Sequence, residues 1–293
     1  MNLTKFSTTT IQTALRMAVR KLFPFHKTAR IDAEVLLAHG IKRTRAYLHA
    51  WPENLLSSEQ IHHFMSLVQR RAAGEPVAYL TGIREFWSLP LTVTRATLVP
   101  RPETELLVEQ ALQRISYTTS SHIADLGTGC GAIALAIASE RPASRVVATD
   151  IDKEALVVAR QNAEKLSIPN LEFRQGTWFS PIMGERYHVI TSNPPYIGKN
   201  DPHVSRGDVR YEPRGALIAG LDGLEAISIL VSEAKTHLFQ QGWLIVEHGY
   251  DQQGSVIKLF AAHGYKNIQG LTDYAGQGRV VIGQYLPLQT QEI

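Results

Sequence analysis

The sequence has little cysteine and no long apolar run. Cys130 is the single cysteine, so no disulfide can form within the chain. No run approaches the roughly 18 apolar residues of a membrane-spanning helix, and the N-terminus lacks the apolar region of a signal peptide. These absences exclude a disulfide framework and argue against a membrane protein. We therefore expect a cytoplasmic protein that needs no membrane.

A strong charge of either sign is also lacking. The chain has 27 acidic residues and 30 Lys and Arg residues, which gives it a net charge of +3. The basic clusters fit solvated helix faces better than the broad basic field of many nucleic-acid enzymes, so no direct nucleic-acid contact is needed. His62 and His63 are adjacent rather than four apart on one helical face, and we expect no metal site. The basic clusters are Arg16-Arg20-Lys21, Lys42-Arg43-Arg45 and Arg70-Arg71.

Length and periodicity divide the chain into three parts. With 293 residues, 44% of them hydrophobic, it can form more than one buried core. Apolar residues at helical spacing through residues 1–75 predict a small N-terminal helical bundle. The pattern of residues 76–100 is strand-like and predicts a β-hairpin linker, with a turn at Ser88-Leu89-Pro90. Strands and helices alternate through residues 101–293, which predicts an α/β domain.

A glycine-rich turn follows the strand predicted for residues 121–126. The turn, Gly127-Thr128-Gly129-Cys130-Gly131-Ala132, leads into an apolar helix from Ile133 to about Glu140. Strand, glycine turn and helix are the context that a nucleotide-binding loop requires. Glycine lets backbone approach a ligand closely, and a helix N-terminus favours an anionic group. In this turn Cys130 is interpreted as a small filler, not a nucleophile.

Three acidic residues accompany the turn. Asp150 ends the next predicted strand, about 20 residues beyond the glycines, where an acid binds ribose hydroxyls. Asp152 precedes a helical pattern and fits an N-cap better than a ligand contact. Asp125, just before the glycines, fits equally a structural acid that accepts from loop amides or a group near the amino end of a ligand.

The most informative motif is Asn193-Pro194-Pro195-Tyr196, after the strand-like residues 187–192. Each proline fixes its own φ and pushes the preceding residue to an extended conformation, so the loop is stiff. The Asn193 side-chain oxygen and the Pro194 carbonyl can accept the two hydrogens of a planar NH2 group, and the Tyr196 ring can cover its plane. A rigid corner with a surface tyrosine is the alternative.

Two such acceptors suit the alkylation of an amide or aromatic amine nitrogen. This nitrogen is a poor nucleophile because its lone pair is delocalised. Acceptors on its hydrogens turn the lone pair toward an electrophile and stabilise the positive charge that grows on nitrogen in the transition state. The proton can leave afterwards, so no strong general base is required.

Together these motifs resemble the class I S-adenosylmethionine-dependent methyltransferases. Residues 82–87, 98–105 and 209–213 narrow the resemblance, over nearly the whole chain, to the peptide-chain-release-factor glutamine methyltransferases. The resemblance implies a Rossmann-like, mostly parallel sheet with an antiparallel last strand. It also implies methyl transfer from S-adenosyl-L-methionine to the side-chain amide nitrogen (N5) of the glutamine in the Gly-Gly-Gln loop of class I bacterial release factors. The bundle would dock the release factor.

The resemblance also implies roles for single residues. Asn193, Pro194 and Tyr196 would act in catalysis, and with Pro195 they would bind the glutamine. Many class I methyltransferases hold the adenine amine with an acid near position 177, but Thr177 cannot, so backbone groups and Trp178 would hold adenine. Core packing is the alternative for Trp178. The implied cofactor residues are Gly127, Thr128, Gly129, Cys130, Gly131, Asp150, Trp178 and Asn193.

Two segments have more than one interpretation. Arg101 lies before a helix predicted to start near Glu103 or Thr104, and either faces the substrate loop or forms a structural ion pair. The polar, irregular residues 199–220 suit a lid or a substrate-docking loop.

Two other functions explain part of the pattern. An N-methyltransferase acting on an exocyclic amine of adenine or guanine in DNA or rRNA would share the Asn-Pro-Pro-Tyr chemistry, but it predicts base-stacking aromatics. An NAD-linked oxidoreductase or a non-catalytic nucleotide-binding module would use the glycine turn and leave Asn193–Tyr196 unexplained. The protein-glutamine methyltransferase accounts for both motifs.

Overall fold

The computed structural model describes residues 9–205 and 207–286. The chain forms two compact units. The first contains the described residues up to Ile83 together with residues 207–211, and the second contains the remainder. The division therefore falls inside the predicted linker of residues 76–100, and a short segment from late in the sequence belongs to the first unit. None of the helices in the described ranges has the length and apolar character needed to cross a membrane.

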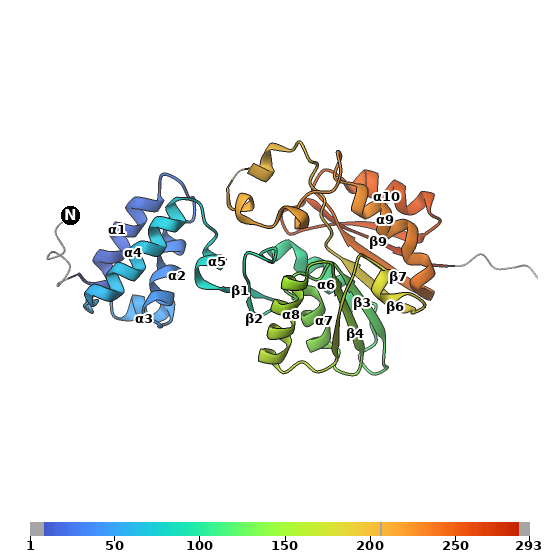
Figure 1. Ribbon diagram of the computed structural model, residues 1–293, viewed down its shortest axis with the longest axis horizontal. Helices are drawn as coiled ribbons and strands as arrows, with labels where there is room; N and C mark the ends of the chain where they lie inside the picture. The colour runs from blue at the N-terminus through green and yellow to red at the C-terminus, as the bar shows by residue number, and fades with distance from the viewer. Residues whose placement is uncertain (1–8, 206, 287–293) are drawn as a thin grey trace, which may run out of the picture. The chain divides into compact units, whose positions relative to one another are not determined.

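The first unit is a bundle of helices around its own apolar core (Figure 1). Ser57 starts α4 with a capping box, in which its hydroxyl accepts from the Gln60 N–H and the Gln60 side chain accepts from the Ser57 N–H. The core side chains recur at the helical spacing that predicted the bundle, as Ile11, Ala14 and Ala18 do in the first helix. The helices are α1 (Ile11–Leu22), α2 (Ala29–Gly40), α3 (Arg45–Ala50), α4 (Ser58–Ala72) and α5 (Val77–Thr81).

Residues 207–211 join this unit through Arg71. The Arg71 side chain is buried and donates to Asp32 and Asp208, each across 2.7 Å, and the Tyr211 hydroxyl donates to the Ala73 carbonyl across 2.9 Å. The interpretation of the basic clusters as solvated faces is therefore wrong for Arg71. A buried guanidinium must be paired with an acid. Arg71 has two such partners, and one of them, Asp208, comes from a segment that no local pattern connects to the bundle.

The predicted hairpin is present, but two of its details were wrong. Residues 77–81 form α5 instead of strand, because Pro76 starts a turn of helix and Gly82 ends it in the left-handed conformation, φ 73°. The hairpin consists of β1 (Ile83–Phe86) and β2 (Leu89–Thr92). Its turn lies at Trp87 and Ser88, both at positive φ (51° and 57°), rather than at Ser88-Leu89-Pro90. Two such residues give the two-residue turn that matches strand twist.

The second unit is built on a seven-stranded sheet in the order β5-β4-β3-β6-β7-β9-β8. The first five strands in this order are parallel, and β9 runs antiparallel to both of its neighbours. The predicted mostly parallel sheet with an antiparallel last strand is confirmed. The strands are β3 (His122–Leu126), β4 (Arg145–Asp150), β5 (Leu171–Gln175), β6 (Tyr187–Ser192), β7 (Leu238–Glu247), β8 (Lys266–Thr272) and β9 (Gly278–Gln284).

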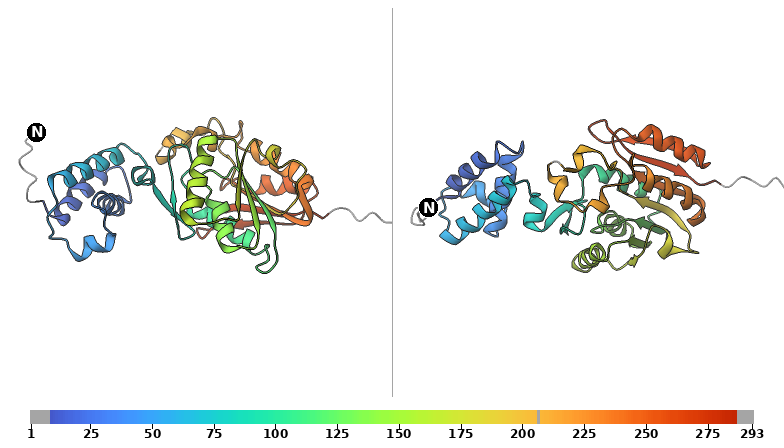
Figure 2. Two further views of the ribbon diagram at one scale, coloured as in Figure 1. Left: turned by 60° about the horizontal axis from the view of Figure 1, so that its bottom comes forward. Right: turned by 45° about the horizontal axis from the view of Figure 1, so that its top comes forward.

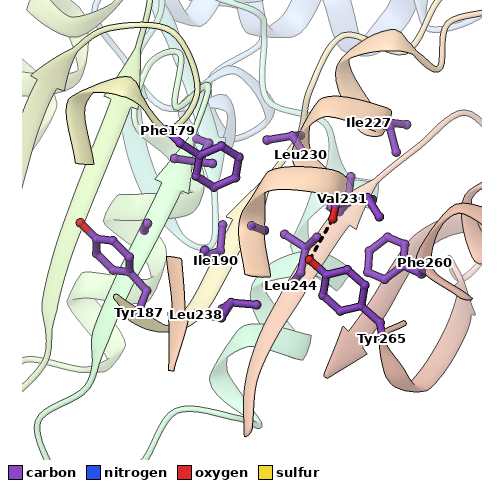
Figure 3. Packing of buried hydrophobic residues seen from close by; sticks show 14 of the residues in the cluster. Phe179, Tyr187, Ile190, Ile227, Leu230, Val231, Leu238, Leu244, Phe260 and Tyr265 are labelled. Atoms are coloured by element: carbon purple, nitrogen blue, oxygen red, sulfur yellow. Dashed lines mark hydrogen bonds between the residues drawn. The ribbon is translucent and has the colours of Figure 1, made fainter. Parts of the chain in front are cut away.

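Helices cover both faces of this sheet, with α6, α7 and α8 on one face and α9 and α10 on the other (Figures 1 and 2). Alternate strand residues point to opposite faces. Ala124 and Leu126 of β3 thus join the α9/α10 core, in which the Tyr265 hydroxyl donates to the Val231 carbonyl across 3.1 Å (Figure 3). The helices are α6 (Glu105–Leu112), α7 (Ala132–Glu140), α8 (Lys153–Leu166), α9 (Glu225–Glu233) and α10 (Gln253–Ala262).

Chain order reverses between β3 and β6, the two strands that carry the motifs. In the sheet, β4 and β5 lie on one side of β3, whereas β6 and β7 lie on the other side. The loops that leave β3 and β6 therefore diverge. Ligands of open α/β sheets bind outside the carboxyl ends of strands at such a switch point. The glycine turn after β3 and Asn193–Tyr196 after β6 lie at this edge.

Candidate functional site

A cavity of about 540 Å³ lies at this edge, wholly within the second unit. This volume is within the range of about 300–1,000 Å³ typical of small-molecule sites. Its wall brings together the glycine turn, the end of β4, the loop after β5 and the loop after β6. Its lining includes Thr104, Gly127, Thr128, Gly129, Cys130, Asp150, Thr177, Trp178, Asn193 and Pro195.

The glycine turn needs glycine for its backbone. Gly127, Gly129 and Gly131 have φ of 74°, 58° and 88°, in the left-handed region. Gly131 also begins α7, where a Cβ would lie 3.0 Å from Leu135 Cδ1. Cys130 is buried, and burial raises the pKa of its thiol to about 12, so the thiol stays protonated. This agrees with Cys130 as a filler.

Asp150 fastens the glycine turn to β4. Its Oδ2 accepts the Gly129 N–H across 2.8 Å and its Oδ1 accepts the Asp152 N–H across 2.9 Å. Burial raises the pKa of Asp150 while these backbone hydrogen bonds lower it. Each carboxylate oxygen keeps a second lone pair, so Asp150 can still accept a ligand hydroxyl. The hydrogen bond from Gly129 to Asp150 was not predicted from the sequence.

The other two acids have structural partners. Asp152 caps α8 by accepting the N–H of Glu154 across 2.7 Å and of Ala155 across 3.4 Å, which confirms the N-cap prediction. Asp125 is fully buried and accepts the Thr191 hydroxyl across 3.0 Å. Burial raises the pKa of Asp125 to about 6. Asp125 is absent from the cavity lining formed by the described residues, which favours the structural interpretation.

Trp178 serves the core and the cavity together. It lines the cavity beside Thr177 and also packs against the apolar core under α9 and α10. Its φ of 46° is unusual for a bulky residue, and a Cβ on Gly127 would lie 3.7 Å from its ring. The two interpretations of Trp178 are therefore compatible.

Asn193 presents an open acceptor at the cavity wall. Its Oδ1 is buried and has no hydrogen-bond partner within the described ranges, while its Nδ2 donates to the Thr104 hydroxyl across 3.3 Å. Pro195 also lines the cavity. Pro194 is buried and, like Tyr196, is outside the lining that the described residues form. Of the four-residue motif, two side chains thus reach the cavity.

Tyr196 is positioned by contacts with the core and with Glu247. Its ring packs against the core, and its hydroxyl makes a long 3.5 Å hydrogen bond to Oε1 of Glu247 at the end of β7. Burial raises the pKa of Tyr196, so the hydroxyl stays protonated. Neither Thr104 nor Glu247 was identified from the sequence. A hydroxyl and an acid 143 positions apart (247 minus 104) carry no shared local pattern.

The flanking motifs support the segment that carries Thr104. Arg84 donates to the Pro100 carbonyl across 3.1 Å, and Arg101 pairs with the buried Glu212 across 2.6 Å. The ion-pair interpretation of Arg101 is confirmed. No group of three His, Cys, Asp or Glu side chains suited to a metal ion occurs in residues 9–205 and 207–286.

Comparison with known proteins gives matches over both units. Residues 13–82 match the PrmC N-terminal domain and residues 102–206 the methyltransferase small domain. The release factor glutamine methyltransferase of Aliivibrio fischeri is 48% identical over 258 residues, covering 88% of this chain and 90% of that protein. The Vibrio cholerae enzyme of the same name is 48% identical over 278 residues, covering 94% and 97%.

Among solved structures, a methyltransferase from Pyrococcus furiosus has a TM-score of 0.53 at 18% identity. The match covers 76% of this chain and 98% of that chain, and it shows a shared fold.

Proposed function

We propose, since this chain belongs to the family of release factor glutamine methyltransferases, that it methylates the N5 amide nitrogen of the glutamine in the Gly-Gly-Gln loop of class I bacterial release factors, in the cytoplasm. The chain is a methyltransferase by its domain and its relatives. The observation that carries the substrate proposal is the unpartnered, buried Asn193 Oδ1 at the cavity wall. An unmet buried acceptor costs about 1–3 kcal/mol, and a substrate amide hydrogen would satisfy it.

The same cavity fits S-adenosylmethionine. Its volume is suitable, the positive-φ glycines let the backbone come close, and Asp150 keeps free lone pairs beside the turn. When bound, this cofactor supplies a methyl group activated by a sulfonium. The residues proposed to hold it are Gly127, Thr128, Gly129, Cys130, Gly131, Asp150, Trp178 and Asn193, and all of these except Gly131 line the cavity.

The proposed chemistry rests on positioning. Asn193 Oδ1 and the Pro194 carbonyl would accept the two hydrogens of the glutamine amide, which turns the nitrogen lone pair toward the methyl donor. The Pro194–Pro195 bond lacks an N–H, and both prolines fix φ, so the loop has little freedom to reorient. Tyr196, held at Glu247, would support the loop from the core side. The same acceptors would stabilise the positive charge that develops on nitrogen.

The test of this proposal is methylation with labelled S-adenosylmethionine. We expect label in an unmethylated class I release factor, located by mass spectrometry at the Gly-Gly-Gln glutamine. DNA and rRNA, offered in parallel, are expected to remain unlabelled. Label in nucleic acid with none in the factor would overturn the substrate and support the exocyclic-amine alternative.

The first unit is proposed to dock the release factor. Phe23 and Phe25, in the connection between α1 and α2, expose 76% and 66% of their surface. Exposed aromatic side chains are common anchors of protein interfaces. The double variant Phe23→Ser/Phe25→Ser should lower kcat/KM for the intact factor about fivefold or more, equivalent to roughly 1 kcal/mol. A short Gly-Gly-Gln peptide should be methylated at the wild-type rate.

Met183→Ser is the matched control for this experiment. Met183 is 77% exposed, but it lies in the second unit, so its loss should affect neither substrate. Equal losses on factor and peptide in the double variant would instead mean that the two aromatic residues support the enzyme itself.

A further inference from the structure

The Asn193–Tyr196 loop is stiffened by its prolines only as far as the second of them. The loop begins directly after β6, whose last residue pairs with both neighbouring strands. Each proline fixes its own φ and restricts the residue before it, which favours extended backbone at Asn193 and Pro194. Neither effect restricts the backbone after Pro195. The loop therefore needs a second anchor, at Tyr196, if its two proposed acceptors are to keep a fixed spacing.

The half-buried side chain of Gln252 supplies this anchor. Its Nε2 donates to the Tyr196 carbonyl across 2.9 Å and to the Asp222 carbonyl across 3.3 Å. Its Oε1 accepts the Gly249 N–H across 2.8 Å. Only the NH2 end of an amide can donate to two carbonyls, and only the oxygen can accept an N–H. The three partners therefore fix the direction of the Gln252 amide.

The backbone of Gln252 is fixed as well. Gln252 is the N-cap residue of α10, and its carbonyl accepts the Val256 N–H across 3.0 Å. Its own N–H donates to the Gly249 carbonyl across 2.9 Å. Because α10 packs against β8 and β9, the side chain extends from a rigid part of the unit. We infer that Gln252 restrains the loop, rather than the loop restraining Gln252.

A turn at Gly223 packs closely against this contact. Gly223 has φ of 77°, and a Cβ at this position would overlap the Tyr196 carbonyl oxygen and lie 2.8 Å from Gln252 Nε2. Any larger residue would therefore push the carbonyl away from its donor. The turn leaves just enough room for the hydrogen bond between Gln252 and Tyr196.

The backbone that follows Tyr196 joins the cavity wall. The Ile197 N–H donates to the Leu217 carbonyl across 2.9 Å, and the Ile197 carbonyl accepts the Ala219 N–H across 3.0 Å. Residues 218–220 line the cavity. A displacement of Tyr196 would thus move one wall of the cavity together with the loop.

We propose that Gln252 is a positioning residue that fixes the end of the Asn193–Tyr196 loop by holding the Tyr196 carbonyl. In this role it keeps the two acceptors of the substrate amide, Asn193 Oδ1 and the Pro194 carbonyl, at a constant spacing. The inference rests on the proposed function, which supplies the amide. Gln252 is outside the cavity lining that the described residues form, so it acts through the loop and not on the reacting atoms.

The first test is Gln252→Met in the full chain. Methionine has nearly the length of glutamine but no N–H, so the variant removes both donated hydrogen bonds at similar shape. We expect the single-turnover rate of methylation of a Gly-Gly-Gln peptide at pH 8 to fall about tenfold, near the upper end for one hydrogen bond.

Gln252→Glu adds a measurement that a loss of packing would not change. At pH 8 its ionised carboxylate can accept the Gly249 N–H but cannot donate to Tyr196, so the rate should fall as in Gln252→Met. A protonated carboxyl can donate one hydrogen to the Tyr196 carbonyl. With an ordinary glutamate pKa, the rate relative to wild type should therefore rise about twofold or more from pH 8 to pH 5. The same ratio for Gln252→Met should stay constant.

The comparison with wild type at each pH removes the titration of groups that all the proteins share. These groups surround Gln252 on the neighbouring elements, and they are Asp222, Glu225, Glu247, His248, Asp251 and Arg279.

Gln253→Met is the matched control. Gln253 is the next residue along α10, but its side chain packs beside Gly270 of β8 and Gly278 of β9. The rate of this variant should stay within about twofold of wild type. Affinity for S-adenosylmethionine, measured by calorimetry, should also stay within about twofold in all three variants, because neither glutamine belongs to the proposed cofactor set.

The outcomes separate this inference from the proposed function. If wild type methylates the peptide and Gln252→Met keeps the wild-type rate, the positioning role is wrong and the function stands. Parallel losses of rate, cofactor affinity and melting temperature would also overturn the inference, because they indicate a structural role. A constant ratio for Gln252→Glu between pH 8 and pH 5 would overturn it too. If wild type methylates neither the peptide nor the intact factor, the proposed function fails and the inference fails with it.

Discussion

Replacing Asn193 by alanine is expected to lower the single-turnover rate of methyl transfer to a Gly-Gly-Gln peptide by about 10²–10³-fold, or about 2.7–4 kcal/mol. The estimate follows from the loss of one preorganised polar group at a site of developing charge. Asn193 Oδ1 is buried and without a partner among the described residues, so its acceptor capacity is available to a substrate. S-adenosylmethionine binding, measured by calorimetry, should change much less.

Asn193→Asp is a second test of the same side-chain group. It keeps an acceptor and adds a charge that must be desolvated, and the charge can attract the sulfonium into an unproductive position. We expect this variant to bind the cofactor and to react well below the wild-type rate. Near-normal single-turnover rates in both variants would show that Asn193 does not orient the nitrogen.

Asp150→Ala is expected to weaken S-adenosylmethionine binding by about 1.5–3 kcal/mol, the range for hydrogen bonds to a charged group. The variant removes the proposed ribose acceptor and leaves the Gly129 N–H without its 2.8 Å partner, so the turn loosens as well. Titration calorimetry measures the affinity directly. An unchanged dissociation constant would remove Asp150 from the cofactor site.

Asp152→Ala is the matched control for Asp150→Ala. It deletes an acid two positions away whose side chain caps α8. We expect about 1 kcal/mol of lost stability, the usual effect of removing an N-cap, with little change in cofactor affinity. Weaker binding in Asp152→Ala than in Asp150→Ala would transfer the ribose role to Asp152.

Where local pattern and tertiary structure agree, the sequence predicted the fold well. The strand before Gly127, the helix after it and the strand that ends at Asp150 each have their own periodicity and their own start and stop signals. Residues 77–81 were mistaken for strand because five residues are too few to separate the two periods. β7 begins at Leu238, which pairs with Tyr187 of β6.

The parts of the site that could be predicted from the sequence are those in which a recognisable motif lies within a single loop. The glycine turn and Asn193 lie at the same cavity because the carboxyl ends of parallel strands share an edge. Glu247 gave no signal, since an acid at the end of a strand is ordinarily solvated. Glu247 is nevertheless buried, and the Tyr196 hydroxyl that contacts it across 3.5 Å comes from a distant part of the chain.

Because residues 207–211 belong to the first unit, this unit can be completed only late in the synthesis of the chain. A chain emerging from a ribosome offers residues up to Ile83 first, and these include Arg71 and Asp32. Asp208, the second carboxylate on Arg71, follows 137 residues after it. At about 5–20 residues per second this interval lasts roughly 7–27 seconds. During that time Arg71 can pair with Asp32 but lacks Asp208, and its hydrogen bond to Asp208 forms only after β6 has been made.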